Sequence, residues 1–308
     1  MLRNHLIFHT GALGDFILSW PLALALSRLY PHGRIIYVTH RSKGRLAEAV
    51  LGVESADIDS AFAALWSPTA MLPAQAQAML AGAAGIYTFA AGPDNIAAEN
   101  MRRCAPQAPM LFLRTVPPDG FAAHAVDYLV DQLKSLPALA ECTAGAARYM
   151  RQYGLCPRRT PRDRLLVIHP GSGSMHKCWP ADGFVEVARA ARAAGALVRF
   201  VLGEAELERW PADRIDALAA AAEVCCPDDY LELAAVLRSA AACLGNDSGP
   251  SHLAGALGVP TACIFGPTSP ATWAPLGPAV RVLHGRPIDS ITVADVLHVV
   301  DEMLKTAR

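Results

Sequence analysis

Short runs of β-branched and aromatic residues alternate with longer stretches of helical periodicity along most of this 308-residue chain. The runs HLIFHT (5–10), RIIYVTH (34–40) and GIYTFA (85–90) have the length and composition of buried strands. Helical patterns separate them, first over residues 15–29 and then near 43–50. Strands that alternate with helices in this way predict a parallel sheet with helices on both faces, because parallel neighbours need crossover connections. The chain is therefore expected to belong to the α/β class.

The alternation stops once, at residues 151–164, and then starts again. In this segment, RQYGLCPRRTPRDR, prolines and arginines replace the alanine-rich periodicity, as in an exposed linker. We therefore expect an N-terminal domain over residues 1–152 and a C-terminal domain over 153–308, each Rossmann-like and doubly wound. Ligands of such sheets bind at the C-terminal ends of the strands, so a cleft between the two domains is the expected site. For the last predicted helix, over 292–304, packing back on the N-terminal domain is an alternative position.

Charge and cysteine content argue against several classes of function. The 27 Lys and Arg residues nearly balance the 28 Asp and Glu residues, so no overall field attracts nucleic acid. The eight cysteines form no CxxC pair, which indicates neither a zinc site nor a disulfide framework and favours reduced, cytoplasmic thiols. No stretch approaches the roughly 20 uninterrupted apolar residues of a membrane span, so membrane contact is expected to be peripheral if it occurs.

The segment LGNDSGPSHLAGALGVP (244–260) predicts a strand, a tight turn and a short helix. Pro250 suits the first helical position, and Asp247 or Ser248 can cap the helix. A later glycine and proline stop it after about two turns. The free N–H groups of such a helix, the Gly249 backbone and the Ser248 hydroxyl would form an anion site suited to a diphosphate. A plain strand-to-helix connection capped by Asp247 explains the same residues equally well.

A second loop, HPGSGSMHKCWP (169–180), follows a predicted strand and resembles a phosphate cradle. Its two glycines allow close approach of the backbone to a ligand. Its polar groups for such a ligand are the side chains of Ser172, Ser174 and Lys177. It is not a Walker loop, since that motif requires Gly at 176 and Ser or Thr at 178. A solvated loop lysine is the alternative for Lys177.

Two carboxylates also follow predicted strands. Asp15 is expected at the start of the first helix, where it could cap the first turn or act as a general base, and the residues alone favour the cap. Glu204, in VLGEAE (201–206), lies just beyond a strand end, where acidic residues bind ribose hydroxyls. An ordinary solvated glutamate is the alternative there. The histidines at 169, 176 and 252 match no standard spacing of metal ligands.

Four motifs in this order resemble those of glycosyltransferase family 9, the heptosyltransferases that build the inner core of bacterial lipopolysaccharide. They are GDFILSWP, HPGSGSMHKCWP, LGEAE and NDSGPSHLAGALGVPTACIFGPTSP. The resemblance reaches from the first loop to about Pro278 and is most specific over 246–270. It implies a glycosyltransferase B fold, with the acceptor on the N-terminal domain and the nucleotide on the C-terminal domain. It also implies inverting transfer from a nucleotide diphosphate sugar, typically ADP-heptose, without metal or further cofactor.

The resemblance also implies roles for single residues. Asp15 matches the aspartate proposed as catalytic base, Lys177 the lysine near the donor diphosphate, and Glu204 the acidic residue at the ribose. The loop that meets the diphosphate and donor sugar corresponds to Asp247, Ser248, Gly249 and His252, together with Ser172 and Ser174 of the preceding loop.

The acceptor side departs from the family pattern. The HTGAL sequence before Asp15 lacks the basic residue often found there. We hypothesise instead that Arg41, Lys43 and Arg45 meet acceptor phosphates beside Gly14, with a solvated helix start as the alternative.

Two other functions fit the same architecture. A sugar-nucleotide epimerase would share the donor pocket but need no acceptor, and a non-catalytic nucleotide-sugar-binding protein would keep the fold alone. The expected partners of a glycosyltransferase are a nucleotide sugar and a glycolipid or oligosaccharide acceptor, not nucleic acid. The expected location is the cytoplasm, where peripheral contact with the inner face of the membrane is compatible with such an acceptor.

Overall fold

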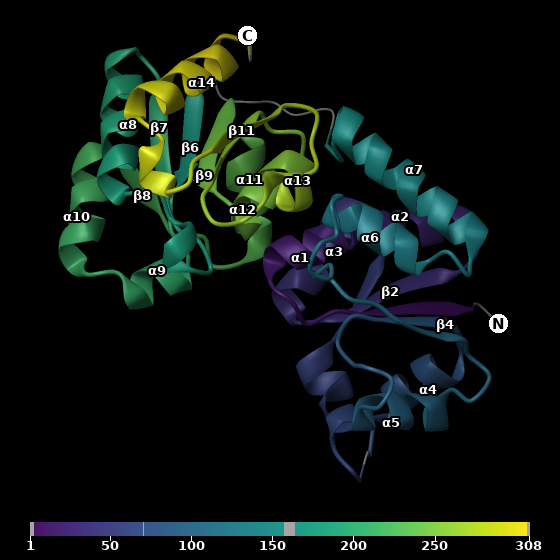
Figure 1. Cartoon of the computed structure of the whole chain (residues 1–308). Coiled ribbons are helices and arrows are strands. Elements are labelled where there is room, and N and C mark those ends of the chain that lie inside the picture. Colours follow the sequence, from purple (N-terminus) through teal and green to yellow (C-terminus); the bar gives the residue numbers. More distant parts are fainter. Residues whose placement is uncertain (1–2, 70, 157–163, 307–308) are drawn as a thin grey trace. The chain divides into compact units, whose positions relative to one another are not determined.

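The computed structural model describes residues 3–69, 71–156 and 164–306, and it consists of two compact units. The first unit contains residues 1–121 and 125–148, and the second contains 122–124 and 149–308. The division falls inside helix α7 (Pro137–Tyr153). The predicted domain limits of 1–152 and 153–308 stay a prediction. The expectation of an α/β chain with two doubly wound sheets is confirmed (Figure 1).

The first unit has a parallel sheet in the order β3-β2-β1-β4-β5. Its strands are β1 (Asn4–Phe8), β2 (Arg34–Thr39), β3 (Glu54–Asp57), β4 (Ala83–Thr88) and β5 (Met110–Phe112). Its helices are α1 (Leu13–Leu18), α2 (Trp20–Leu29), α3 (Arg41–Leu51), η1 (Ile58–Phe62), η2 (Ala63–Trp66), α4 (Ala74–Ala81), α5 (Ile96–Cys104) and α6 (Ala125–Gln132), followed by α7. Helices α4 and α5 cover one face of the sheet, and α2 and α6 lie on the other (Figure 1).

The predicted helix over 15–29 is two helices, α1 and α2, separated by Ser19. The Ser19 hydroxyl donates to the carbonyl of Phe16 and lies 2.9 Å from the Tyr37 hydroxyl on β2, so the break is anchored to the sheet. A proline at position 21 then suits the first turn of α2.

The second unit has a parallel sheet in the order β11-β10-β9-β6-β7-β8. Its strands are β6 (Leu165–His169), β7 (Leu197–Val201), β8 (Glu223–Cys225), β9 (Ala242–Asn246), β10 (Thr261–Phe265) and β11 (Val280–His284). Its helices are η3 (Met175–Lys177), α8 (Ala181–Ala193), α9 (Glu204–Arg209), α10 (Ala212–Ala221), α11 (Tyr230–Arg238), α12 (Gly249–Ala256), α13 (Pro270–Trp273), η4 (Ile288–Ser290) and α14 (Val293–Thr306). This is the strand order of dinucleotide-binding domains, and it reverses between β6 and β9.

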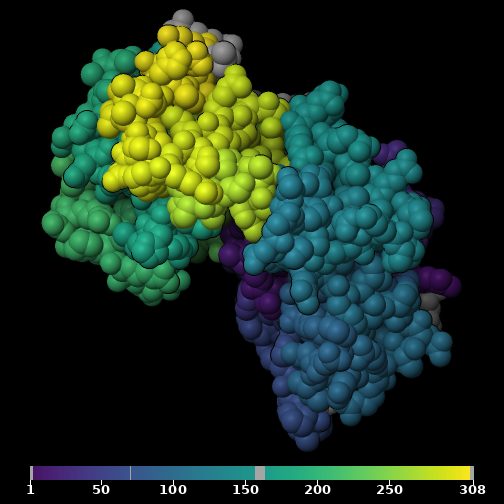
Figure 2. Space-filling model, viewed as in Figure 1, coloured from purple at the N-terminus to yellow at the C-terminus, as the bar shows by residue number. Residues whose placement is uncertain are grey.

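The last helix, α14, completes the core of the second unit. Its buried residues Val296, Val300 and Leu304 pack with apolar residues of α8, β9 and β10. These contacts place the apolar face of α14 on its own sheet, and additional packing on the N-terminal domain stays a prediction. Figure 2 shows α14 and the residues before it, in yellow, forming part of the surface of this unit.

Strand order determines which loops meet in each unit. The order reverses between β1 and β4 in the first sheet and between β6 and β9 in the second. At such a reversal the loops after the two neighbouring strands run in opposite directions and leave a crevice at the C-terminal edge. Three of the loops singled out in the sequence follow β1, β6 and β9, so they lie at these reversals, whereas Glu204 follows β7 and the cations at 41–45 follow β2.

Candidate functional site

The loops after β6 and β9 of the second unit are joined through one buried amide. Asn246, the last residue of β9, has no exposed surface. Its Nδ2 atom donates to the carbonyls of Pro170 and Gly171 over 2.8 and 3.3 Å, and its Oδ1 atom accepts from the backbone N–H of Trp179 over 3.0 Å. Both ends of the loop 170–179 are thereby held on β9. The sequence carries no signal for this role, because a buried asparagine at a strand end looks like any polar turn residue.

Asp247 and Lys177, predicted in separate loops, form an ion pair. Lys177 Nζ donates to Asp247 Oδ2 over 2.9 Å, and the hydroxyl of Thr268, from the loop after β10, donates to the same oxygen over 2.8 Å. The Asp247 side chain is 6% exposed and that of Lys177 33%. Burial raises the pKa of Asp247, but contacts from His252, Lys177 and Thr268 outweigh burial and lower it to about 2. Thr268 was absent from the predicted site.

Helix α12 begins beside this ion pair. Ser248 is its N-cap residue but makes no side-chain capping bond, and Pro250 is the second helical residue, not the first as predicted. Asp247 does not cap the helix, because its carboxylate faces Lys177 and Thr268 and lies 3.8 Å from Nε2 of His252. The interpretation of this loop as a plain Asp-capped connection is therefore wrong.

The loop 170–179 leaves one of its two glycines open to a ligand. A Cβ atom on Gly171 would overlap Oε1 of Glu206, whereas a Cβ atom on Gly173 would meet nothing within 4 Å. Ser172 donates its hydroxyl to the Asp247 carbonyl over 2.9 Å, and Ser174 is the half-buried N-cap of η3. Packing thus requires glycine at 171, while the space at 173 remains available.

A second acidic side chain beside this loop, Glu206, was absent from the predicted site. Glu206 is buried, and its Oε2 atom accepts from the N–H of Gly203, the N-cap residue of α9, over 2.9 Å. Glu204 is the exposed first residue of the same helix. A Glu at the third position of a helix that follows glycine is a recognisable capping signal, which could have found it. The ribose role of Glu204 stays a prediction.

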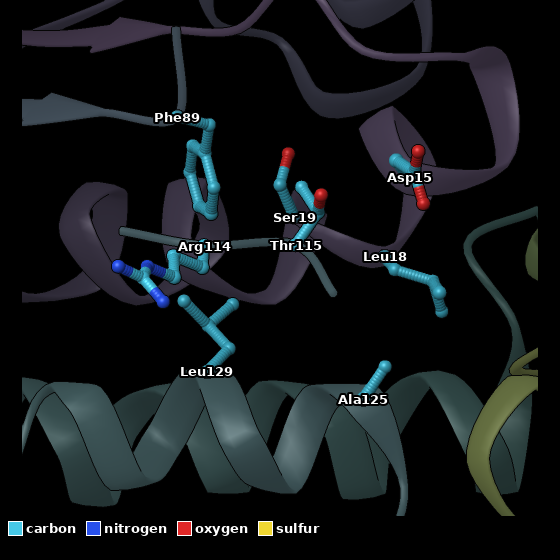
Figure 3. Close-up of a pocket in the computed structure, with 8 residues that line it drawn as sticks. All are labelled: Asp15, Leu18, Ser19, Phe89, Arg114, Thr115, Ala125 and Leu129. Carbon is cyan, nitrogen blue, oxygen red and sulfur yellow. The ribbon is translucent and has the colours of Figure 1, made fainter. Parts of the chain in front are cut away.

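In the first unit, Asp15 lines a small pocket of about 10 Å³ with Leu18, Ser19, Phe89, Arg114, Thr115, Ala125 and Leu129. Asp15 is the third residue of α1, and Ala12 is the N-cap, so Asp15 does not occupy the N-cap position; its role as first-turn cap or as general base stays a prediction. Figure 3 shows its carboxylate on one side of the pocket and the Arg114 guanidinium on the other, beside Phe89 and Leu129, with Ser19 and Thr115 between the two charged groups. The pocket lining thus includes one carboxylate and one guanidinium.

The three cations predicted to meet acceptor phosphates do not form one exposed cluster. Arg41 and Arg45 are exposed, but Lys43 is buried on the inner face of α3. Its Nζ atom donates to the carbonyl of Gly11 over 2.6 Å, in the loop between β1 and α1. Gly14, predicted beside them, is the half-buried second residue of α1.

His9, the residue after β1, is a buried histidine with no hydrogen-bond partner for either ring nitrogen among the described residues. Its ring packs on Phe16 and Phe89 at centroid distances of 5.4 and 5.2 Å. Burial, and after it the positive charge of Lys43, lowers the pKa of His9 to about 3. In the unfolded chain His9 therefore binds a proton below about pH 6.5. In the folded chain it does so only below about pH 3.

Replacing His9 is expected to reduce the acid sensitivity of the fold. Stability is complete above about pH 6.5 and falls as the pH drops toward 3, because only the unfolded state is protonated there. In His9→Met the loss of unfolding free energy between pH 7 and pH 4.5 should be smaller than in the wild type by about 2 kcal/mol. Urea unfolding at the two pH values measures it. Equal losses in both proteins would contradict a neutral His9.

Metal clusters and membrane spans are both absent from the part of the chain that the structure describes. Within residues 3–69, 71–156 and 164–306, no group of three or more His, Cys, Asp or Glu side chains is placed to hold a metal ion. None of the helices described in these ranges is long and apolar enough to cross a bilayer.

Sequence comparison finds relatives of one kind. The profile of Glycosyltransferase family 9 (heptosyltransferase) matches residues 120–291, more than half of the chain. A stretch of 110 residues is 39% identical to Lipopolysaccharide heptosyltransferase 1 of Pseudomonas aeruginosa. That stretch covers 36% of this chain and only 31%, about a third, of the relative.

Solved structures resemble the whole chain. A glycosyl transferase family 9 protein from Veillonella parvula has a TM-score of 0.72 at 19% identity, over 99% of this chain and 98% of its own. The ADP-heptose lps heptosyltransferase II of E. coli has a TM-score of 0.71 at 18% identity, over 99% of both chains. The E. coli heptosyltransferase WaaC with ADP has a TM-score of 0.66 at 18% identity, over 98% of this chain and 100% of its own. At these identities the likeness shows a shared fold.

Proposed function

Because the chain belongs to glycosyltransferase family 9, we propose that it is an inverting, metal-independent glycosyltransferase that moves heptose from ADP-heptose onto a glycan acceptor. The family membership suggested by the four loop motifs is confirmed by the profile match. The observation that carries the proposal is the Lys177–Asp247 ion pair at the reversal between β6 and β9, next to the start of α12 and the open space at Gly173.

These groups suit the donor diphosphate. Among the described residues Lys177 has one hydrogen-bond partner, Asp247, and an ammonium carries three donors. Two donors can therefore serve phosphate oxygens, and the first N–H groups of α12 add to them. Positive groups held in place where negative charge develops stabilise a departing diphosphate. A heptosyltransferase of the same fold has been solved with ADP, which supports an ADP-linked donor.

The pocket of the first unit suits the acceptor. Asp15 can accept the proton of an acceptor hydroxyl, which is the role of a general base in inverting transfer. At the other end of the pocket, Arg114 can bind an anionic group of the acceptor, and the Phe89 ring offers an apolar wall for a sugar. We assign Arg114 the contact with an acceptor phosphate or carboxylate that was predicted for the cations at 41–45.

The expected acceptor is a lipopolysaccharide-core saccharide or a related glycolipid. The relative from Pseudomonas aeruginosa carries lipopolysaccharide in its name, which supports this class. An enzyme that uses a cytoplasmic sugar nucleotide and a lipid-linked acceptor would work at the inner face of the cytoplasmic membrane through peripheral contact.

Transfer assays with purified protein test the proposal. Release of ADP from ADP-heptose is expected only when a lipopolysaccharide-core acceptor is present, and it should survive EDTA. Proton NMR of the product should show the anomeric configuration opposite to that of the donor. UDP-, GDP- and dTDP-sugars serve as competing donors. Conversion of the nucleotide sugar without acceptor would instead identify an epimerase, and tight nucleotide binding without turnover would identify a binding protein.

A further inference from the structure

Lys43 is a buried cation that the proposed chemistry leaves without a role. It lies in the first turn of α3, its residue surface is 6% exposed, and its Nζ atom is 2.6 Å from the carbonyl oxygen of Gly11. Burial lowers the pKa of Lys43, while the charges of Asp15 and Asp59 raise it. A buried charge is costly to keep unless other groups compensate it. The groups that Lys43 contacts must therefore compensate the cost of burying its charge.

Gly11 connects Lys43 to the candidate base. A Cβ atom on Gly11 would lie 3.5 Å from both Cβ and Oδ2 of Asp15. It would also lie 2.9 Å from Cε1 of His9, so Gly11 lies beside both side chains and a larger residue would press on His9. Lys43 thus holds the carbonyl of the residue on which the Asp15 side chain packs, and its charge acts on the same carboxylate.

The other charged and titratable groups around Asp15 come from several elements. His9, at the end of β1, stays neutral down to about pH 3. Asp59, on η1, is a second acidic neighbour of Lys43 and is paired with His40, the N-cap residue of α3, over 2.9 Å. Arg114 lines the far end of the pocket. Among these groups Lys43 is the buried cation on the Asp15 side.

We propose that Lys43 is a positioning residue for Asp15, which fixes the loop against the carboxylate and keeps that carboxylate ionised for proton acceptance. The inference rests on the proposed function of Asp15. In that reaction the acceptor oxygen bonds to the anomeric carbon and its proton passes to Asp15. The bond from the anomeric carbon to the phosphate oxygen breaks, and its electron pair leaves with the diphosphate.

Two substitutions separate the effect of the Lys43 charge from that of its hydrogen bond to the Gly11 carbonyl. Lys43→Gln keeps an N–H that can donate to the Gly11 carbonyl but removes the charge, and Lys43→Arg keeps the charge. Lys43→Gln should move the acid limb of the kcat profile to higher pH by about one unit, because an opposite charge that favoured the carboxylate is gone. Lys43→Arg should leave the limb in place, and the donor KM should stay within about twofold in both variants.

Lys134 provides a matched control. It is 75% exposed in the first unit and pairs with Asp131 on the surface. Lys134→Gln should leave both the kcat profile and the donor KM unchanged. An acid limb in Lys43→Gln at the wild-type position would overturn the inference, and so would a shift of equal size in Lys43→Arg.

Two further measurements separate failure of this inference from failure of the proposed function. Carbon-13 NMR of labelled aspartate, assigned with Asp15→Asn, should show Asp15 titrating at higher pH in Lys43→Gln than in the wild type, and it needs no turnover. An unchanged titration would overturn the inference even in an active enzyme.

In the Asp15→Asn background, Lys43→Gln should lower kcat by less than about twofold, because the effects of residues that act through one group are not additive. If the wild-type protein transferred no sugar, the proposed function would be wrong. The NMR titration of Asp15 would then still test the role of Lys43.

Discussion

Asp15→Asn is expected to lower the kcat for sugar transfer by about a hundredfold to ten-thousandfold, which is the range that general bases contribute. Asparagine has nearly the shape of aspartate, so the pocket with Phe89 and Arg114 should stay intact, but the amide oxygen is too weak a base to take the proton. The donor groups Lys177 and Asp247 belong to the second unit, so the affinity for ADP should not change. Steady-state kinetics and calorimetric titration with ADP measure the two quantities.

A surface aspartate of the same unit serves as control. Asp131 on α6 is 45% exposed in its side chain and pairs with Lys134. Surface ion pairs contribute little to stability, so Asp131→Asn should keep both kcat and ADP affinity. Transfer at the wild-type rate in Asp15→Asn would remove Asp15 from the mechanism and leave the pocket as a binding site only.

The second large effect is expected at Lys177, because this side chain pairs with Asp247 and is also proposed to bind the donor diphosphate. In Lys177→Met the donor loses a cation at its diphosphate, and kcat/KM should fall by about a hundredfold to a thousandfold, as when one stabilising donor is removed from other active sites. Most of this loss should appear as weaker binding of ADP. Lys177→Arg, which keeps the charge, should recover part of it.

The same substitution should also weaken the fold, since it leaves Asp247 buried with Thr268 and His252 as its contacts. Removing one partner of a charged hydrogen bond costs about 1–2 kcal/mol here, after allowance for the one-third exposure of Lys177. A carboxyl with a pKa of about 2 stabilises the folded state fully above about pH 4, and this contribution is lost as the pH falls toward 2. Lys177→Met should therefore lose less stability over that interval than the wild type, as measured by chemical unfolding.

Lys305 offers a matched substitution for this test. It is an exposed residue of α14 in the same unit, so Lys305→Met should change neither ADP affinity nor unfolding free energy. If Lys177→Met bound ADP as tightly as the wild type, the donor site would have to lie elsewhere in the chain.

The regular elements were largely predictable because their signals are local. β1, β2 and β4 coincide with the predicted strands 5–10, 34–40 and 85–90 to within two residues at each end, since each is a short, largely buried run. β3 (Glu54–Asp57) and β8 (Glu223–Cys225) were missed because these edge strands are three or four residues long and contain no fully buried residue. Their place in the sheets comes from pairing with β2 and β7, not from their own composition.

The candidate site was predictable only in part. Lys177 and Asp247 were both singled out as donor-loop residues, but their ion pair joins residues 70 positions apart. Thr268 joins them from a third loop, and Arg114, which lines the pocket of Asp15, was absent from the predicted site. Lys43 was grouped with its basic neighbours in the sequence, whereas helical geometry turns it inward and them outward. The family roles of these residues stay predictions.

The sequence by itself determined the α/β class, the position of each ligand-facing loop after a strand, and the family. It could do so because helix and strand periods and loop motifs depend on residues within a few positions of one another. Only the tertiary structure decided that β6 lies beside β9 and β1 beside β4, and hence which loops meet. It also decided that Lys43 points at Gly11 and that Asn246 holds the loop after β6. Those outcomes depend on strand order and on which helix face is buried, and both are set by packing between segments far apart in the chain.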